Sequence, residues 1–362
     1  MTLIMNNVYG LVYFYWKLIN MKVLFYSAKK FEIPYFDTAN HTHVELIYTE
    51  EPLSMKTVNL AKGFEYISVF TADDVSGDVI KLLHLNGVTH IAVRAAGFDN
   101  VDLKAANELG IHVANVPEYS PFSVAEHAIS LMLALNRKIV IANEQVHMHN
   151  FKLDNLVGSD MNGKTVGIIG TGRIGKIAAK ILHGFGCKLL GYDINPDRRL
   201  KEEYNLRYCN LQEVCLYSDI ITVHTPLNPS TKYLLDRKLF SFMKKGIMII
   251  NTSRGAVIKT EDLITYLENG IIGAYGMDVY EHEKGIFFYD HSAEKSQDKM
   301  LLKLLSMKNV LVTPHQAFAT YEALTNIAET TFYNLLEWNE GFRSDNELTT
   351  FSKFISAFGS KM

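Results

Sequence analysis

The sequence predicts an α/β protein with two Rossmann-like, doubly wound parallel-sheet lobes and a cleft between them. Short β-rich runs alternate with helical patterns through most of the 362 residues. This alternation favours parallel sheets with helices on both faces. It stops once, in a stretch without proline or glycine between Pro121 and Gly158, and resumes at Lys164. At roughly 150 residues per domain, the length also agrees with about two domains.

The first alternating region supplies one sheet and its helices. Apolar and β-branched runs predict strands, and apolar residues at helical spacing predict helices. The expected strands are Val23–Tyr26, Val44–Tyr48, Tyr66–Phe70, Ile91–Arg94 and Gly110–Asn115, and the expected helices are Ser54–Ala61 and Val79–Asn86.

A long helix is expected between the two regions. Ser123 followed by Glu126 has the spacing of a capping box, and Val124–Val146 is mostly apolar. The prediction is one continuous helix that joins the lobes.

The second alternating region supplies the other sheet. Its expected strands are Thr165–Ile169, Lys188–Asp193, Asp219–His224, Ile247–Asn251, Ala274–Asp278 and Val310–Thr313. Its expected helices are Ile174–Phe185 and Glu261–Asn269. The first of these helices carries apolar residues at the i, i+3, i+4, i+7 positions of a buried face.

Composition excludes several classes of partner. The 36 basic and 39 acidic side chains leave a net charge of −3, too weak a field to attract nucleic acid or an anionic membrane. Cys187, Cys209 and Cys215 lack metal-ligand or C-x-x-C spacing, so we expect no metal site and a reducing, cytoplasmic location.

Residues 1–20 are expected to be a dispensable extension that precedes the fold. The apolar run at 10–20 is much shorter than the roughly 20 residues that span a bilayer. It also lacks a basic n-region and a small-residue cleavage site. Met21 then opens a run typical of a buried first strand, so we expect no membrane segment.

The strongest local motif is a glycine-rich turn between a strand and a helix. Gly170, Gly172 and Gly175 form G-x-G-x-x-G. In that context the glycines permit a tight turn, close approach of a pyrophosphate and close helix packing. Asp193 ends the next strand, where a carboxylate accepts hydrogen bonds from ribose hydroxyls and repels a 2′-phosphate. The pattern predicts a dinucleotide site that prefers NAD over NADP, although the nearby Arg198 and Arg199 leave that preference open.

Three further segments, each after a strand, supply an arginine, a carboxylate and a histidine: Arg254, Glu283 and His315. Hydride transfer to a 2-keto acid requires these residue types. A guanidinium holds the substrate carboxylate with two bonds, an imidazole donates a proton to the carbonyl oxygen, and a carboxylate fixes the tautomer of that imidazole. His224 is the rival histidine, but it lies at the end of an expected strand and is expected to border the nicotinamide.

Several segments resemble the D-isomer-specific 2-hydroxyacid dehydrogenases, most closely the bacterial fermentative D-lactate dehydrogenases. They are RAAGFDNVD at 94–102, VPEYSPFSVAEH at 116–127, GTGRIG at 170–175, NTSRGAVI at 251–258, GMDVYEHEKGIFFYDHS at 276–292 and TPHQAFATYEALTNIAETT at 313–331. The resemblance implies reduction of pyruvate to D-lactate by NADH. It leaves open another D-2-hydroxy acid, such as 2-hydroxyisocaproate, or a non-catalytic NAD-sensing interaction protein.

The resemblance also implies roles for individual residues. Arg254 would bind the substrate carboxylate, His315 would be the acid/base, and Glu283 its partner. Further substrate contacts are implied for Ala96, Gly97, Tyr119 and Phe318. Cofactor contacts are implied for Gly170, Gly172, Arg173, Ile174, Gly175, Asp193, Thr225, Pro226, Thr252, Ser253 and Asp278.

The family's domain arrangement is implied as well. Residues 21–118 and 317–362 would form a discontinuous substrate domain, and residues 119–316 an NAD-binding Rossmann domain. The lobes would close on a small-molecule substrate, and the chain would form a homo-oligomer.

Overall fold

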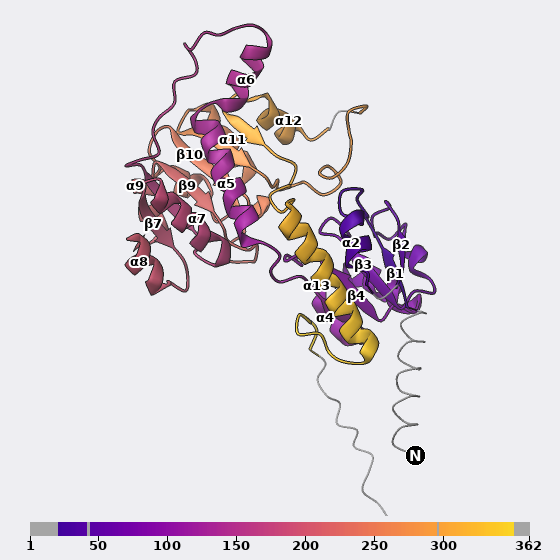
Figure 1. The fold of residues 1–362 in the computed structure, drawn as a ribbon. Coiled ribbons are helices and arrows are strands. Elements are labelled where there is room, and N and C mark those ends of the chain that lie inside the picture. Colours follow the sequence, from indigo (N-terminus) through magenta and orange to yellow (C-terminus); the bar gives the residue numbers. More distant parts are fainter. Residues whose placement is uncertain (1–20, 42–43, 295–296, 351–362) are drawn as a thin grey trace, which may run out of the picture. The chain divides into compact units, whose positions relative to one another are not determined.

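The computed structural model describes residues 21–41, 44–294 and 297–350, and their contacts divide into two units (Figure 1). Unit 1 consists of the described residues up to Tyr119 and from Tyr321 onward, and unit 2 runs from Ser120 to Thr320. Each unit is an α/β body with one parallel sheet, which confirms the predicted fold class. The extension expected at residues 1–20 lies outside the described residues.

The sheet of unit 1 has five parallel strands in the order β2-β1-β3-β4-β5. They are β1 (Lys22–Phe25), β2 (Glu45–Tyr48), β3 (Tyr66–Val69), β4 (His90–Val93) and β5 (His112–Ala114). This is the flavodoxin-like doubly wound order, in which the chain reverses direction across the sheet next to β1.

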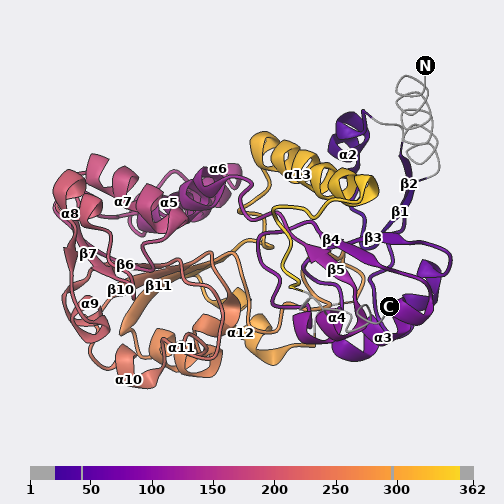
Figure 2. The same cartoon turned by 90° about the horizontal axis from the view of Figure 1, so that it is seen from below.

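Helices cover both faces of this sheet (Figure 2). On one face, α2 (Ile33–Ala39) packs against α13 (Tyr321–Glu340), and α3 (Gly77–Leu85) and α4 (Leu103–Leu109) lie together on the other. A single 3₁₀ turn, η1 (Val58–Ala61), precedes β3. Because α13 comes from the far end of the chain, unit 1 is discontinuous in sequence.

The chain beyond α13 also joins unit 1. The amide of Leu348 donates to the Val113 carbonyl at 2.7 Å, and Glu347 forms an antiparallel bridge with Ala114. The buried Glu347 carboxylate lies 2.8 Å from Nδ1 of His112. These contacts fix the late segment beside β5, at the edge of the sheet.

The sheet of unit 2 has seven parallel strands in the order β12-β11-β10-β9-β6-β7-β8. They are β6 (Thr165–Ile169), β7 (Lys188–Tyr192), β8 (Arg207–Tyr208), β9 (Ile220–Val223), β10 (Ile247–Asn251), β11 (Ile272–Met277) and β12 (Val310–Val312). Renumbered from β6, this is the Rossmann order 3-2-1-4-5-6 with one added strand. The direction of winding reverses between β6 and β9, the position where such sheets bind ligands.

Two layers of helices enclose this sheet (Figure 2). One layer holds α5 (Pro121–Asn136), α7 (Arg173–Gly184) and α8 (Arg198–Tyr204), and the other holds α9 (Leu211–Tyr217), α10 (Arg237–Phe240), α11 (Thr260–Glu268) and α12 (Lys299–Ser306). The short helix α6 (Ile139–His147) contacts α5, and the 3₁₀ turn η2 (Gly255–Val257) follows β10.

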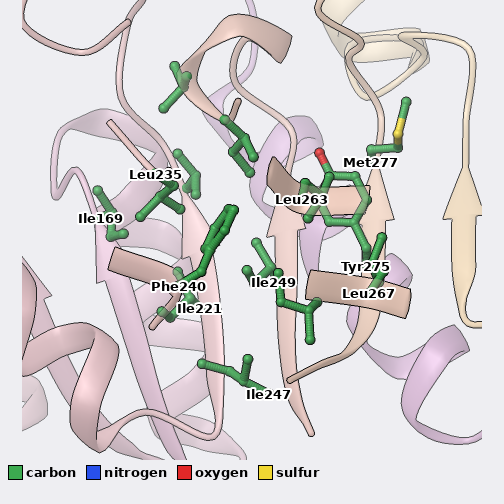
Figure 3. Close-up of a cluster of buried hydrophobic side chains, with 14 of the residues drawn as sticks. Ile169, Ile221, Leu235, Phe240, Ile247, Ile249, Leu263, Leu267, Tyr275 and Met277 are labelled. Carbon is green, nitrogen blue, oxygen red and sulfur yellow. The ribbon is translucent and has the colours of Figure 1, made fainter. Parts of the chain in front are cut away.

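The core between the sheet and the second layer fixes the strand ends that carry the site. Ile221 and Ile249 of the central strands pack with Phe240 of α10 and with Leu263 and Leu267 of α11 (Figure 3). All five side chains are buried. Burying an aliphatic or aromatic side chain contributes about 1.5–3 kcal/mol relative to leaving it exposed, so this layer holds the strands rigidly.

The helix predicted for Val124–Val146 is wrong as one element. The structure has two helices, α5 and α6, separated at Arg137 and Lys138, and Lys138 adopts a left-handed backbone with φ of 51°. The Lys138 ammonium donates to the Asn155 carbonyl at 2.8 Å. Because neither glycine nor proline marks this break, the sequence pattern gave no signal for it.

The helix predicted for Ser54–Ala61 shrinks to the turn η1. The amide of Ser54 donates to Oγ1 of Thr57 at 2.9 Å, and the Tyr26 hydroxyl donates to the Thr57 carbonyl at 3.2 Å. Such side-chain bonds to the backbone compete with helical bonds.

Across the part of the chain that the structure describes, no helix combines the length and the apolar character needed to cross a membrane.

Candidate active site

The glycine-rich turn joins β6 to α7, next to the position where the winding of the unit 2 sheet reverses. Its three glycines differ in what a side chain would meet at each position. Gly170 has φ of 91°, and a Cβ on it would lie 2.6 Å from the His224 carbonyl oxygen. A Cβ on Gly175 would lie 2.0 Å from the Gly170 carbonyl oxygen. At Gly172, the N-cap of α7, a Cβ would instead enter open space. Two glycines therefore allow close packing, and the third leaves a cradle in front of a helix N-terminus, which suits a pyrophosphate.

Asp193 lies directly after β7 and is bonded to this turn. Its Oδ2 accepts from the Thr171 amide at 2.6 Å and from the Thr171 hydroxyl at 3.1 Å. Its Oδ1 accepts from the Asn195 amide at 2.8 Å. The carboxylate is thus fixed beside the cradle, where the ribose of a dinucleotide would lie.

The arginines that left the cofactor preference open lie beyond Asp193. Arg199 forms two bonds with Asp197, at 3.0 Å and 3.3 Å, and Lys176 lies 2.6 Å from the same carboxylate. Asp197 therefore engages Arg199, so a 2′-phosphate would have to compete with this carboxylate for the Arg199 guanidinium.

Buried polar atoms lie in the segments that directly follow β9 and β10. Among the described residues, Oγ1 of Thr225, Oγ1 of Thr252 and Nδ1 of His224 are buried without a hydrogen-bond partner. A buried polar atom without a partner is costly, and a polar ligand removes that cost. The predicted residues Thr225 and Thr252 therefore fit a nicotinamide cofactor, with Pro226 and Ser253 as their chain neighbours.

His224 does not suit the role of proton donor. Burial lowers its pKa to about 4, so the ring is neutral at physiological pH. Its Nε2 lies 3.0 Å from Oγ1 of Thr222. This environment favours His315 over His224 as the acid.

The loop after β10 packs directly against the loop after β11. A Cβ on Gly255 would lie 2.0 Å from the Tyr280 carbonyl carbon and 2.2 Å from the Glu281 nitrogen. Only glycine permits this approach of the two backbones. As a result Arg254 and Glu283 belong to two loops in direct contact.

The buried side chain of Asn251 shapes the loop that carries Arg254. Its Nδ2 donates to the Arg254 carbonyl at 3.0 Å, and its Oδ1 accepts from the Ser253 amide and hydroxyl at 3.1 Å and 2.8 Å. The guanidinium of Arg254 donates to the Ser253 carbonyl at 2.8 Å. The sequence analysis missed Asn251, although its position at the end of a buried strand is a usable signal.

His315 and Glu283 form the central pair of the site. Nδ1 of His315 lies 2.8 Å from Oε1 of Glu283, and Oε2 of Glu283 accepts from the Tyr280 amide at 2.9 Å. The ring of Phe288 lies 5.5 Å from the imidazole, and that of Phe318 lies 6.5 Å away. A carboxylate on Nδ1 selects the tautomer that donates there, so the imidazole has one fixed partner and one nitrogen, Nε2, for chemistry.

Asp278 lies inside unit 2 and is fully buried. Its carboxylate accepts from Thr313, Gln316 and Ala317, the residues around His315. These contacts give Asp278 a role in holding the histidine turn, and its implied contact with the cofactor stays a prediction. Arg173 and Ile174 are the first residues of α7, beside the cradle.

The remaining predicted substrate residues belong to unit 1, except Phe318. Ala96 and Gly97 follow β4, and the Ala96 carbonyl accepts from Nδ2 of Asn115 at 2.8 Å. The Tyr119 carbonyl accepts from Nδ2 of Asn326 at 2.6 Å. Their implied contacts with substrate stay predictions.

Replacing Asp193 with alanine is expected to weaken NADH binding and to narrow the preference for NADH over NADPH. The carboxylate would no longer accept from ribose hydroxyls or repel a 2′-phosphate. Fluorescence titration of both cofactors measures the ratio, and Asp236→Asn is the control, since that carboxylate caps α10 in the other helix layer of unit 2. An unchanged ratio in Asp193→Ala would place cofactor selectivity elsewhere.

The order of the strands, the glycine-rich turn and the acidic residue after β7 together define a dinucleotide-binding α/β protein. The chain is similar to known members of one class of such proteins. Residues 129–317 match the family described as "D-isomer specific 2-hydroxyacid dehydrogenase, NAD binding domain". The chain is 44% identical to the D-lactate dehydrogenase of Escherichia coli over 91% of its length and 100% of that protein.

Solved structures agree with this match. The pyruvate reductase of Chlamydomonas reinhardtii aligns with a TM-score of 0.85 and 42% identity, over 91% of this chain and 99% of that one. A D-lactate dehydrogenase from Aquifex aeolicus, complexed with NAD and lactic acid, aligns with a TM-score of 0.81 and 31% identity, over 91% and 100%. The chain therefore belongs to the D-isomer-specific 2-hydroxyacid dehydrogenases. The predictions of this family and of NAD as its cofactor are confirmed.

Proposed function

We propose that this enzyme reduces pyruvate to D-lactate with NADH. The observation that carries the proposal is the His315–Glu283 pair at 2.8 Å, in a loop system that also holds Arg254. Relatives that share 44% and 42% identity with the chain bear the names D-lactate dehydrogenase and pyruvate reductase, which supports pyruvate as the substrate.

The chain's own residues divide the work of the reaction. Arg254 binds the carboxylate of the 2-keto acid through two parallel N–H bonds. Glu283 holds the His315 ring through Nδ1–H, and when the ring is protonated its Nε2–H donates a proton to the carbonyl oxygen as the alcohol forms, which leaves the neutral ring with its hydrogen on Nδ1. When bound at the glycine turn, NADH supplies the hydride. The aromatic rings of Phe288 and Phe318 near the imidazole help to exclude water.

The substrate is tested with a panel of 2-keto acids. We expect NADH oxidation with pyruvate to exceed that with 4-methyl-2-oxopentanoate, and chiral analysis of the product to give D-lactate. Higher kcat/KM with the branched acid would assign the enzyme to 2-hydroxyisocaproate instead. NADH binding without turnover of any keto acid would favour the non-catalytic NAD-sensing role.

Replacing Arg254 with lysine is expected to lower kcat/KM for pyruvate by about 10- to 150-fold, the loss of one charged hydrogen bond. An ammonium is a point charge that cannot form the planar two-bond fork. The control is Arg237→Lys, because Nε and Nη2 of the exposed Arg237 both donate to one oxygen of the buried Asp262, so this variant also exchanges a paired guanidinium for an ammonium. Steady-state kinetics unchanged in Arg254→Lys would contradict the assignment.

We also propose that the enzyme is a cytoplasmic homo-oligomer. The three cysteines are free, which agrees with a reducing compartment. A groove of about 560 Å³ between the α5–α6 region and the α12–β12 region is lined by Val140 and Leu305, whose exposed fractions are 44% and 56%. Exposed apolar patches of this kind mark association sites.

Light scattering with size-exclusion chromatography tests the oligomer. We expect the parent to elute as a multimer, and Leu305→Glu or Val140→Glu to shift it toward the monomer. A monomeric parent would overturn this proposal and leave the proposed reaction untouched.

A further inference from the structure

The turn that carries His315 has a backbone conformation that other contacts must maintain. His315 has φ of 55°, in the left-handed region that non-glycine residues seldom occupy. Such conformations persist at functional sites only where the surrounding structure holds them. The Glu283 carboxylate contacts the imidazole and not the backbone of this turn, so something else must hold the backbone.

Asp278 holds the turn from both sides. One carboxylate oxygen accepts from the Thr313 hydroxyl at 2.6 Å and from the Gln316 amide at 2.8 Å. The other accepts from the Ala317 amide at 2.9 Å. These bonds join the residues before and after His315 to one fully buried anion.

His127 joins this network from helix α5. Its Nε2 lies 3.0 Å from Oγ1 of Thr313 and 3.4 Å from Oδ1 of Asp278. Since the Thr313 hydroxyl donates its hydrogen to Asp278, its oxygen is left to accept from Nε2–H of His127. The side chain of His127 is only 17% exposed, so water screens this contact little.

We propose that His127 is a positioning residue for the reduction: through Thr313 and Asp278 it holds the histidine turn in the conformation that places the His315 imidazole. The inference rests on the proposed function of His315 and adds a residue from α5 to the machinery. Catalysis is sensitive to such placement, because a displacement of about 1 Å can cost about 100-fold in rate.

A matched pair of substitutions at His127 tests the proposal. His127→Phe keeps a planar aromatic ring, although a larger one, and removes the N–H donor, whereas His127→Gln keeps an N–H donor near the same place. His183→Gln is the control, since His183 is an exposed histidine on α7 of the same unit. We expect kcat with pyruvate to fall about tenfold or more in His127→Phe, with partial recovery in His127→Gln and parental values in the control.

A second set of variants changes the hydroxyl group of Thr313. Thr313→Val removes the bridge and Thr313→Ser retains it, and Thr265→Val is the control, because Thr265 bonds only to its own helix on an exposed face. We expect Thr313→Val to lower kcat about as much as His127→Phe and Thr313→Ser to stay near the parent. NADH dissociation constants should remain within about twofold in all variants, because the glycine turn is unaffected.

The deciding readout needs neither cofactor nor turnover. Diethyl pyrocarbonate modifies unprotonated imidazoles, and mass spectrometry of the peptides reports the rate at His315 in the protein without NADH. The His315 side chain is 15% exposed, so we expect slow modification in the parent and faster modification in His127→Phe and Thr313→Val. Modification at His84, an exposed residue of α3 in unit 1, should not change.

Each result supports or overturns the proposal. Parental kcat and a parental His315 modification rate in folded His127→Phe would overturn it, as would a Thr313→Ser variant as impaired as Thr313→Val. If His127→Phe fails to fold, the Gln variant and the Thr313 pair decide. Absence of pyruvate turnover in the parent would reject the proposed function, while the modification rates would still report whether the network holds His315.

Discussion

Replacing His315 with glutamine is expected to lower turnover of pyruvate by about 10²- to 10⁴-fold, the contribution of a positioned general acid. Glutamine has a similar length and an N–H donor, but an amide does not give up a proton to the forming alkoxide. The glycine turn and Asp193 are untouched by this change, so NADH should bind with nearly parental affinity. Steady-state NADH oxidation and fluorescence titration measure the two quantities.

The control for this prediction is His282→Gln. His282 is exposed and directly precedes Glu283 in the chain, but its ring faces Tyr280 at a centroid distance of 5.7 Å. Parental kinetics are expected there. A decrease in pyruvate turnover of less than about tenfold in His315→Gln would show that another group supplies the proton.

The positions where the strands of unit 2 end could be predicted from the sequence, because the local pattern of apolar residues determines them. Buried parallel strands are near-continuous apolar runs, and Thr165–Ile169 and Ile247–Asn251 have the predicted bounds. The carboxyl ends of parallel strands share one edge of the sheet, so Gly170 and Asp193 could be brought together by topology alone. The 2.6 Å bond between the Thr171 amide and Asp193 agrees with that inference.

Contacts between distant segments could not be predicted in the same way. His127 and Thr313 are separated by 186 positions, and no periodicity relates a helix face to a turn so far along the chain. The need for glycine at position 255 is also a long-range effect. It comes from the nearby backbone of Tyr280 and not from a positive φ. The contacts divide the chain after Thr320, and the Ala317 amide donates to Asp278 within unit 2.

Unit 1 contains a buried charged side chain that the amino-acid composition could not reveal. Arg94 was predicted as the last residue of a strand, but it directly follows β4 (His90–Val93). Its side chain is fully buried and makes two bonds with Glu32, at 3.0 Å and 3.3 Å. It also donates to the Tyr26 carbonyl at 2.9 Å and to the Ser68 hydroxyl at 3.2 Å. The rings of Phe25, Phe36 and Phe70 lie 5.2 Å, 5.8 Å and 5.7 Å from the guanidinium carbon.

Replacing Arg94 with leucine is expected to lower the free energy of unfolding of unit 1 by about 3–5 kcal/mol, because it leaves the buried Glu32 without a compensating charge. Trp338 lies in α13 beside His90 of β4 and reports on this unit. Urea unfolding followed by its fluorescence, in a Trp16→Phe background, measures the change. The loop with Ala96 and Gly97 directly follows Arg94, so KM for pyruvate should also rise.

A double-mutant cycle separates the charge from the packing. If desolvation of an unpaired charge dominates, Glu32→Leu alone should cost a similar amount, and the double variant Arg94→Leu with Glu32→Leu should cost much less than the sum of the two. Double-variant stability equal to that sum would contradict the argument, because it would mean that the lost contacts with the three aromatic rings and with Tyr26 and Ser68 matter more than the pairing. The buried pair would then act as a packing element, and Arg94→Met, which keeps much of the side-chain volume, would be the less damaging single change.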